Sequence, residues 1–527
     1  MASKHGRQHG PFVEVELSVS ARKIRNRDLL SISDPMCIMY TKRPCSDVFV
    51  EHGRTESVKD DIDPDFVTKL KIDYFHKEKQ ILKFELYDKD SPSGDLRRHD
   101  YLGHVICTLE DIVENKRIER PIEYKTILDR KGGGTLILSA DEVGERNDIV
   151  TLQFRAEDLD KMDWFGKADP YLVFYRTNPD KSTTIVHRTE ILLKTLNPTW
   201  EPFRLPLRTL CAEDFDSTIY ISCWDWNQRT RDVCIGRCEM TLSELKQRRQ
   251  SSTNFYKLIN FEKKETSTKY DNSGKLFPVS YTIEKRYSLQ DYVKSGLRIH
   301  FTVALHVASV NGSEMRYEKV LTALRQSIEY FDKTRSIRTL GFGATNQDHK
   351  EPDVFFLNGA TNPCCEDVSG VIASYRQTLA SYTATGEADV APVLKYVEKF
   401  ARDHNDDNTY FVAIILIAHV DTTTPSRVKE AIKQVSPQPI SIIIVAVGND
   451  NDDIAGLLKE IEAEDDRPNS EGERPAKHVI NFVCLQDFLD EKGDVFSEDR
   501  LAREVFRKMP DQCLHWMTEN QIKPRYA

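Results

Sequence analysis

Apolar and polar residues alternate over short segments through the first half of the chain. Phe12–Val19 and Ile81–Leu86 carry an apolar side chain at every second position, as expected of strands with one buried face. Turn-forming residues separate such segments at short intervals, which indicates an antiparallel β-sandwich. The pattern then returns, with strands predicted at Ile149–Phe154, Tyr171–Tyr175 and Ile219–Trp224. We therefore predict two antiparallel β-sandwiches in succession.

From about Leu297 the pattern changes, and continuous apolar segments alternate with amphipathic segments of helical period. The apolar segments predict strands at Ile299–Leu305, Thr339–Gly343, Tyr410–Ala418, Ile440–Gly448 and Val479–Cys484. The amphipathic segments predict helices near Met315–Phe331, Asp367–Tyr382, Val390–Arg402, Pro425–Val435, Ile454–Ala463 and Glu498–Met509. Fully apolar strands between helices indicate a sheet covered on both faces, so we predict a doubly wound α/β domain.

Short motifs of the first half recur at an offset of about 134 residues. Asp28 and Asp34 bracket the segment DLLSISDP, and Asp163 and Asp169 bracket DWFGKADP with the same spacing. An offset of this size is the length of a whole domain rather than of a solenoid repeat, and it indicates a domain duplication. The predicted boundaries are 11–130 for the first sandwich, 134–260 for the second, 261–296 for a linker and 297–515 for the α/β domain.

Composition narrows the possible partners and the compartment. The formal net charge of −10 argues against nucleic acid as a partner. Eleven Cys without regular spacing are typical of a reducing cytosol rather than of a disulfide framework. The N-terminal segment MASKHGRQHG lacks the apolar core of a signal peptide, and the longest apolar runs are too short to span a bilayer. We expect a cytoplasmic protein.

The segment Phe84–Gly103 has the composition of a metal-binding loop. It holds four aspartates, Asp88, Asp90, Asp95 and Asp100, within thirteen residues. Such a cluster repels itself unless it is solvated or neutralised, and calcium takes six to eight oxygen ligands from a flexible loop. The alternative interpretation of one such loop alone is a solvated acidic turn.

The first half of the chain resembles two tandem C2 domains, and the whole arrangement is similar to the copine family. The similarity extends from about Pro11 to about Pro510. Its more specific marks are Phe301–Leu305 with Asn311-Gly312, Gly341–Ala344 and Ser441–Val445. The resemblance implies two C2 domains followed by a von Willebrand factor A-type domain. It also implies calcium-dependent binding to anionic phospholipid, recruitment of partner proteins by the A-type domain, and movement to the plasma membrane or other membranes when calcium rises.

The resemblance implies a full set of calcium ligands in the first C2-like domain. These are Asp28 and Asp34 of the first calcium-binding loop and Asp88, Asp90 and Asp100 of the third. Asp95 is an extra carboxylate in a lengthened loop and is not counted as a ligand. Calcium would cancel the negative charge of these carboxylates and share ligands with a lipid phosphate.

The second C2-like domain departs from the family pattern. Its matching residues are Asp163, Asp169, Asp225 and Asn227. Asn227 stands where the pattern has a carboxylate, and counting back from Ile235-Gly236 places Val233 at the last ligand position, with Asp232 one residue early. An amide ligates calcium through oxygen but brings no charge, so we expect this site to bind calcium poorly or not at all.

The first loop of the second C2-like domain carries aromatic residues. Trp164 and Phe165 lie at its expected tip, beside the matched Asp163. Bulky aromatic residues next to a metal loop suit the interface of a bilayer, and we predict that both contact membrane. The alternative is that they cap the core of the sandwich.

The A-type domain lacks the ligands of its family's magnesium site. Where the family has aspartates, this chain has His306 and His419, and Ala388 stands at the position of a threonine. Imidazoles and methyl groups are the wrong ligands for magnesium, so no magnesium is expected. Two His leave zinc as a weaker alternative, and the simplest interpretation is that they fill the abandoned site. Partner proteins would then be recognised without a metal.

Two other function classes remain as alternatives. A membrane-targeted enzyme would need an unrecognised site in the α/β domain, because the chain has no G-x-S-x-G, H-E-x-x-H or G-x-x-x-x-G-K motif. A calcium-independent scaffold would require the aspartates of the first domain to be incidental. We predict a non-enzymatic, calcium-dependent phospholipid-binding adaptor.

Overall fold

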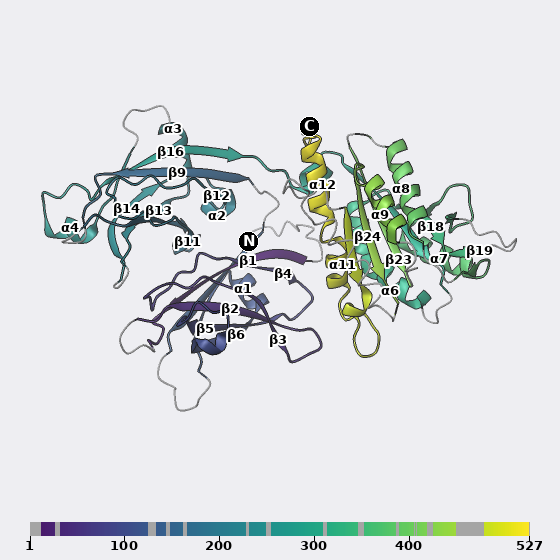
Figure 1. Ribbon diagram of the computed structural model, residues 1–527, viewed down its shortest axis with the longest axis horizontal. Helices are drawn as coiled ribbons and strands as arrows, with labels where there is room; N and C mark the ends of the chain where they lie inside the picture. Colours follow the sequence, from purple (N-terminus) through teal and green to yellow (C-terminus); the bar gives the residue numbers. More distant parts are fainter. Residues whose placement is uncertain are drawn as a thin grey trace, which may run out of the picture. The chain divides into compact units, whose positions relative to one another are not determined.

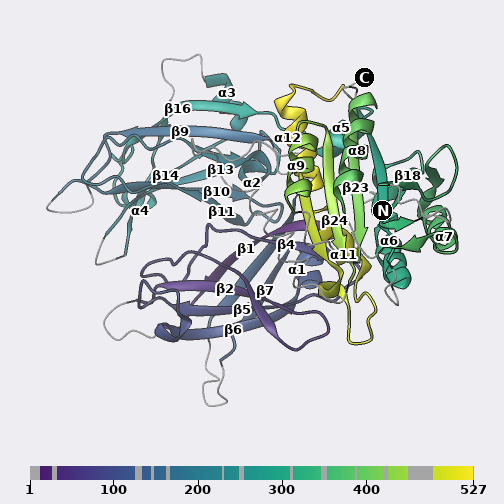
Figure 2. The same ribbon diagram turned by 45° about the vertical axis from the view of Figure 1, so that its right-hand side comes forward.

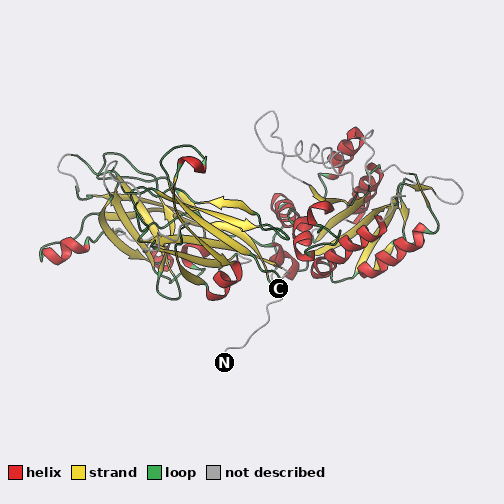
Figure 3. Cartoon of the chain, turned by 90° about the horizontal axis from the view of Figure 1, so that it is seen from below, coloured by secondary structure: helices red, strands yellow, loops and turns green. Residues whose placement is uncertain are grey.

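The computed structural model describes residues 12–26, 32–124, 133–143, 148–161, 166–227, 231–248, 255–308, 313–345, 353–385, 389–404, 406, 408–418, 425–448 and 479–525. The chain forms two compact units, one spanning Val13–Arg286 and the other formed chiefly by Tyr287–Ala527. Strands dominate the first unit, whereas helices flank a sheet in the second (Figure 1, Figure 3). The predicted fold class, two antiparallel sandwiches followed by a doubly wound α/β domain, is confirmed.

The first sandwich packs two four-stranded sheets, ordered β4-β1-β8-β7 and β3-β2-β5-β6. Its strands are β1 Phe12–Arg22, β2 Pro35–Lys42, β3 Phe49–Arg54, β4 Leu70–Phe75, β5 Ile81–Asp88, β6 Asp100–Thr108, β7 Arg117–Pro121 and β8 Thr135–Glu142. The short helices are η1 Leu96–Arg98 and α1 Leu109–Asn115. The alternation in the sequence places Val15 and Leu17 of β1 in the core with Phe84 and Leu86 of β5.

The predicted start of the second sandwich is wrong. The predicted boundary at residue 134 assigns β8 to the second domain, but β8 pairs antiparallel with β1 and with β7 of the first. Leu136, Leu138 and Ala140 of β8 are buried in the first core. Alternation along a strand shows that one face is buried but not which sheet receives it, and the first sandwich runs through Glu142.

The second sandwich repeats the arrangement, with sheets β11-β10-β13-β14 and β12-β9-β16-β15. Its strands are β9 Ile149–Glu157, β10 Pro170–Thr177, β11 Thr183–Arg188, β12 Phe203–Pro206, β13 Ile219–Asp225, β14 Val233–Met240, β15 Tyr256–Lys257 and β16 Lys275–Glu284. The helices are α2 Leu207–Cys211, α3 Leu242–Arg248 and α4 Phe261–Thr266. Its core includes Phe154, Phe174 and Trp200.

The predicted linker at 261–296 is also wrong. It contains β16, which pairs with β9 from Lys275 to Glu284, and α5 Leu289–Lys294, whose Leu289 and Tyr292 belong to the α/β core. Within β16 only Leu276 is fully buried, although apolar and polar residues alternate from Val279 to Glu284.

The α/β unit contains a mixed sheet ordered β20-β18-β17-β23-β24-β25, with β21 also paired to β18. Its strands are β17 Arg298–His306, β18 Ser336–Phe342, β19 Ala344–Thr345, β20 Phe355–Phe356, β21 Cys364–Glu366, β22 Thr383–Ala384, β23 Thr409–Ile417, β24 Ile440–Ala446 and β25 Ile480–Cys484. Its helices are α5, α6 Ser313–Phe331, α7 Asp367–Leu379, α8 Ala391–His404, α9 Pro425–Val435, η3 Leu485–Phe488, α11 Glu498–Phe506 and α12 Met509–Glu519. β17, β18, β23, β24 and β25 are mutually parallel, and β20 and β21 run antiparallel at the edge.

Both faces of this sheet are covered by helices (Figure 2). Buried residues of α6, α7, α11 and α12 pack on one face, and those of α8 and α9 pack on the other. β23 is buried at every position, which explains its unbroken apolar sequence. The predicted helix Ile454–Ala463 lies outside the described residues.

Candidate calcium and membrane site

Three strand ends of the first sandwich meet where its candidate ligands lie. Pro35 at the start of β2 pairs with Asp88 at the end of β5, and Asp88 pairs with Asp100 at the start of β6. A register shift between Leu86 and Tyr87 precedes this end, and such a bulge re-aims the side chains that follow it. The sheet thereby brings carboxylates that are distant in sequence to one end of the sandwich.

Backbone hydrogen bonds orient these carboxylates. The Asp34 N–H donates to Asp88 Oδ1 at 2.6 Å, and the Asp60 N–H donates to Asp34 Oδ1 at 2.7 Å. The Asp100 N–H donates to Asp90 Oδ2 at 3.0 Å. Asp88 is only 2% exposed. Backbone N–H groups of the loops therefore hold these carboxylate oxygens in place. Carboxylate oxygens are hard ligands of the kind that suits calcium.

The remaining carboxylates of this end differ in their surroundings. Asp28 lies outside the described residues. Asp95 caps η1, and its Oδ2 accepts from Arg97 Nη2 at 2.8 Å. This hydrogen bond with Arg97 holds the pKa of Asp95 below its usual value. Within the described parts of the chain, no group of three or more His, Cys, Asp or Glu is placed to hold a metal ion.

The second sandwich builds the same end with the same backbone hydrogen bonds. Pro170 pairs with Asp225. The Asp169 N–H donates to Asp225 Oδ1 at 2.7 Å, as Asp34 does to Asp88. Here too a register shift precedes the end, between Cys223 and Trp224. Asp163, Trp164 and Phe165 lie outside the described residues, so their predicted roles stay predictions.

The third loop of the second sandwich carries different ligands. Val233 lies opposite Asp225, at the register position that Asp100 occupies opposite Asp88. Asp232 has each carboxylate oxygen bound by protein, because Oδ1 accepts from the Asn227 N–H at 2.9 Å and Oδ2 from the Tyr171 hydroxyl at 2.7 Å. Burial and this hydrogen bond to the Asp232 carboxylate raise the pKa of Tyr171. Asp232 thus fastens the loop to β10.

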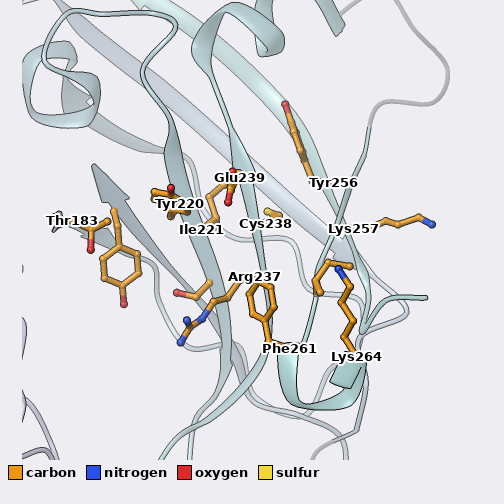
Figure 4. A pocket seen from close by; sticks show the side chains of 13 residues that line it. Thr183, Tyr220, Ile221, Arg237, Cys238, Glu239, Tyr256, Lys257, Phe261 and Lys264 are labelled. Atoms are coloured by element: carbon orange, nitrogen blue, oxygen red, sulfur yellow. The ribbon is translucent and has the colours of Figure 1, made fainter. Parts of the chain in front are cut away.

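A groove of about 750 Å³ lies on the second sandwich, lined by residues of β10, β11, β13–β15 and α4 (Figure 4). Arg237, Lys257 and Lys264 bring positive charge to its lining, and Glu239 brings negative charge. Lys257 pairs with Asp271 at 2.5 Å. Sequence reasoning missed this groove, because α4 lies in the segment predicted to be a polar linker; its one signal was Phe261, which is 55% exposed.

In the α/β unit, His306 ends β17 and is fully buried. Its ring stacks on Phe342 with centroids 5.4 Å apart. Arg316 of α6 donates to the carbonyl oxygen of Val447, just after β24, at 2.8 Å. The imidazole of His306 is therefore packed inside the α/β unit against an aromatic ring. Ala388 and His419 lie outside the described residues.

Family models match most of the chain. The Copine model matches residues 304–525, and the C2 domain model matches residues 14–124 and 149–258. Two C2 domains followed by a Copine domain are the architecture predicted from the sequence. The chain belongs to the copine family. The resemblance drawn from the sequence motifs is thereby confirmed.

Solved structures resemble parts of this copine-family chain. The structure "BON1-C2B" is 24% identical, covers 27% of this chain and 95% of its own, and has a TM-score of 0.23. "Extended-Synaptotagmin 2, C2A- and C2B-domains, calcium bound" is 14% identical, covers 53% and 99%, and has a TM-score of 0.20. Human GIVD cytosolic phospholipase A2 is 11% identical, covers 64% and 45%, and also has a TM-score of 0.20. Among the described residues, no helix has the length and apolar character needed to cross a membrane.

Proposed function

We propose that this protein is an adaptor that binds anionic phospholipid in response to calcium through its first C2 domain. Its C2 and Copine domains support membrane binding in general. The observation that carries the calcium dependence is the convergence of Asp34, Asp88, Asp90 and Asp100 on one end of the first sandwich, where β2, β5 and β6 meet.

The physical argument rests on charge. Carboxylates gathered at one end repel an anionic lipid head group, and calcium bound among them removes this repulsion and offers coordination to the lipid phosphate. Asp34, Asp88, Asp90 and Asp100, with Asp28, would hold the ion. The second C2 domain keeps Asp169 and Asp225 but has Asn227 and Val233 at the other positions, and we propose that it contributes little calcium affinity.

The α/β domain is proposed to recruit partner proteins without a metal and without catalysis. His306 supports this role, because it is buried against Phe342 at the strand end where the family's magnesium site begins. The second function class, a membrane-targeted enzyme, would need a site in the α/β domain that the catalytic motifs considered above do not reveal.

Sedimentation with vesicles of phosphatidylserine and phosphatidylcholine tests the calcium assignment. The full chain carrying Asp88→Asn and Asp90→Asn should lose the increase in sedimentation on adding calcium, with an affinity lower by at least about tenfold. The matched control is Asp225→Asn, which gives the second domain the same pair of amides because Asn227 is already present. The control should respond to calcium as the parent does.

Asparagine keeps the size of aspartate and an oxygen that accepts the Asp34 N–H, so we expect both variants to fold; their melting temperatures check this. The assignment is wrong if the double variant responds to calcium as the parent does. It is equally wrong if the Asp225→Asn control alone abolishes the response.

A further inference from the structure

The second loop of each sandwich has the same backbone in both copies. In the first sandwich it follows β3 and spans residues 58–61, and in the second it follows β11 and spans residues 192–195. The Val58 N–H donates to the Pro35 carbonyl at 3.0 Å, and the Leu192 N–H donates to the Pro170 carbonyl at 3.1 Å. Each loop is therefore fastened to the first residue of the neighbouring strand, β2 or β10.

The next residues match as closely. The Asp60 N–H donates to Asp34 Oδ1 at 2.7 Å, and the Lys194 N–H donates to Asp169 Oδ1 at 2.5 Å. Asp60 and Lys194 also share a left-handed backbone, with φ of 50° and 54°. Positions 60 and 194 are thus structurally equivalent, as are their neighbours.

The side chains at these equivalent positions have opposite character. Lys59 is matched by Leu193, which is 64% exposed, and Asp60 is matched by the exposed Lys194. The loop of the second sandwich therefore presents an exposed apolar side chain and a cation. The loop of the first sandwich presents a cation and a carboxylate at the same positions.

The side chains near Leu193 also differ in charge and polarity from their counterparts in the first sandwich. Val233, 39% exposed, replaces Asp100. The cations Lys167, Lys194 and Arg231 are all exposed. In contrast, Asp225 is 1% exposed and both oxygens of Asp232 are bound within the protein. Among the described residues of this end, the exposed side chains of Lys167, Leu193, Lys194, Arg231 and Val233 are therefore cationic or apolar, whereas the carboxylates of Asp225 and Asp232 are buried or bound by the protein.

We propose that this end of the second sandwich, formed by Lys167, Leu193, Lys194, Arg231 and Val233 and called here the basic tip, contacts an anionic bilayer without calcium. The proposal deepens the proposed function, on which it rests. Small exposed apolar side chains beside cations suit a bilayer interface, where the side chain enters the acyl boundary and the cations meet lipid phosphate. The complementary charge favours an anionic lipid surface.

The two loop ends lie side by side within their common unit. Lys59 of the first sandwich lies over the ring of Trp226 of the second, with Nζ 5.9 Å from the ring centroid. Burial raises the pKa of Asp61, and the charge of Arg231 in the second sandwich opposes this rise. A bilayer that meets the basic tip is therefore close to the calcium end as well. Calcium would strengthen a contact that already exists.

Sedimentation in EDTA with phosphatidylserine–phosphatidylcholine vesicles tests the basic tip in the full chain. The parent should sediment with these vesicles and not with phosphatidylcholine alone. Leu193→Glu with Lys194→Glu should weaken this EDTA-resistant binding by at least about tenfold, because an apolar contact and a cation are both replaced by carboxylates. Val279→Glu is the matched control, since Val279 is 48% exposed on β16 of the same sandwich and lies away from the tip.

The outcomes separate this inference from the calcium assignment. Asp88→Asn with Asp90→Asn should retain the EDTA-resistant binding while losing the response to calcium. If the parent protein does not sediment in EDTA, the proposed lipid contact of the basic tip is wrong, and the calcium assignment still stands. EDTA-resistant binding that survives the tip substitutions, or that Val279→Glu weakens equally, would also overturn it. Single Lys194→Glu, at an exposed position, should give a smaller loss in the same direction if the double variant folds poorly.

Discussion

Thr55 and Thr189 occupy matching places in the two sandwiches, and each hydroxyl accepts the N–H of the adjacent strand at 2.9 Å, from Cys37 and from Leu172. The glutamates that follow them, Glu56 and Glu190, each accept a backbone N–H of the next segment at 2.6 Å. The backbone that supports the loop end is thus the same in both copies. What differs is the set of side chains that this backbone presents.

The comparison separates two roles of aspartate at these ends. Asp34 and Asp169 each accept a backbone N–H from the second loop, and Asp88 and Asp225 each accept one from the first residue before a strand. These bonds stabilise the loops whether or not a metal binds. Aspartates retained in the second sandwich are therefore explained by loop structure alone, and calcium binding must be judged from the other positions.

The side chains at those other positions differ between the two sandwiches. Asp90 and Asp100 of the first sandwich are matched by Asn227 and Val233 of the second, and Asp60 of the second loop is matched by Lys194. We therefore propose that the duplicated sandwich keeps its loop scaffold while its end changes from calcium binding to direct contact with anionic lipid. This difference can be tested by exchanging side chains between the copies.

The largest effect is expected from restoring the missing carboxylates in the second sandwich. Asn227→Asp with Val233→Asp places carboxylates at the register positions of Asp90 and Asp100. Because calcium affinity rises with the charge of the ligand set, calcium should bind the second sandwich about a hundredfold more tightly. Calorimetric titration in the Asp88→Asn, Asp90→Asn background isolates the restored site.

The control for this exchange is Val279→Asp, which adds one carboxylate to the same sandwich away from the loops. It should leave the titration unchanged. If the restored variant binds no more calcium than its background, position 233 is not equivalent to position 100 in function, and the ligand alignment of the second sandwich fails.

The sequence alone predicted some parts of this comparison and missed others. β17 and β23 were found within one residue at each end, because buried parallel strands are continuously apolar. β16 falls within the predicted linker because that prediction rested on the polar segment before it, although apolar and polar residues alternate from Val279 to Glu284. Val233 was aligned with Asp100 from residue spacing, since a strand register preserves spacing up to a bulge.

The second loop and Asp232 lay beyond sequence reasoning for a different reason. Leu193 belongs to the apolar run Ile191–Leu193, in which the sequence does not show that Leu192 is partly buried while Leu193 is exposed. Asp232 is bound by Tyr171, a residue about sixty positions earlier. Contacts over such sequence distances are set by the packed sheets and leave no local pattern.

An intermediate effect is expected from changing the second loop of the first sandwich. Asp60→Lys copies the residue of the equivalent position, and Lys194 shows that a lysine fits this left-handed backbone. Reversing one charge near an anionic surface is worth about 2 kcal/mol, so binding to anionic vesicles in EDTA should tighten by up to about thirtyfold.

The matched control is Asp47→Lys, which makes the same charge change in the turn between β2 and β3, at the opposite end of the sandwich. Vesicle binding in EDTA should then stay close to that of the parent. Equal gains from both substitutions would show that total charge, rather than the loop end, governs the contact with lipid.

The smallest effect concerns pH and a position where the copies differ inside the sheet. His187 pairs with Phe174 at the register position where Gly53 pairs with Met39 in the first sandwich. The His187 ring stacks on Phe203 at 3.9 Å between centroids. Burial lowers the pKa of His187 to about 4, although Glu190 opposes this shift.

The unfolded chain takes up a proton on this imidazole near pH 6.5, whereas the folded sandwich does so only near pH 4. The unfolded state therefore binds more protons in this window, and the stability of the second sandwich should fall as pH drops from 6.5 towards 4. His187→Phe keeps the stack on Phe203 and removes the proton site. The loss of melting temperature between pH 7 and pH 5 should be smaller in this variant by about 2 °C. Between pH 7 and pH 8, where the imidazole is neutral in both states, parent and variant should change equally. If the melting temperature of the variant falls between pH 7 and pH 5 by as much as that of the parent, the pKa of His187 does not change on folding.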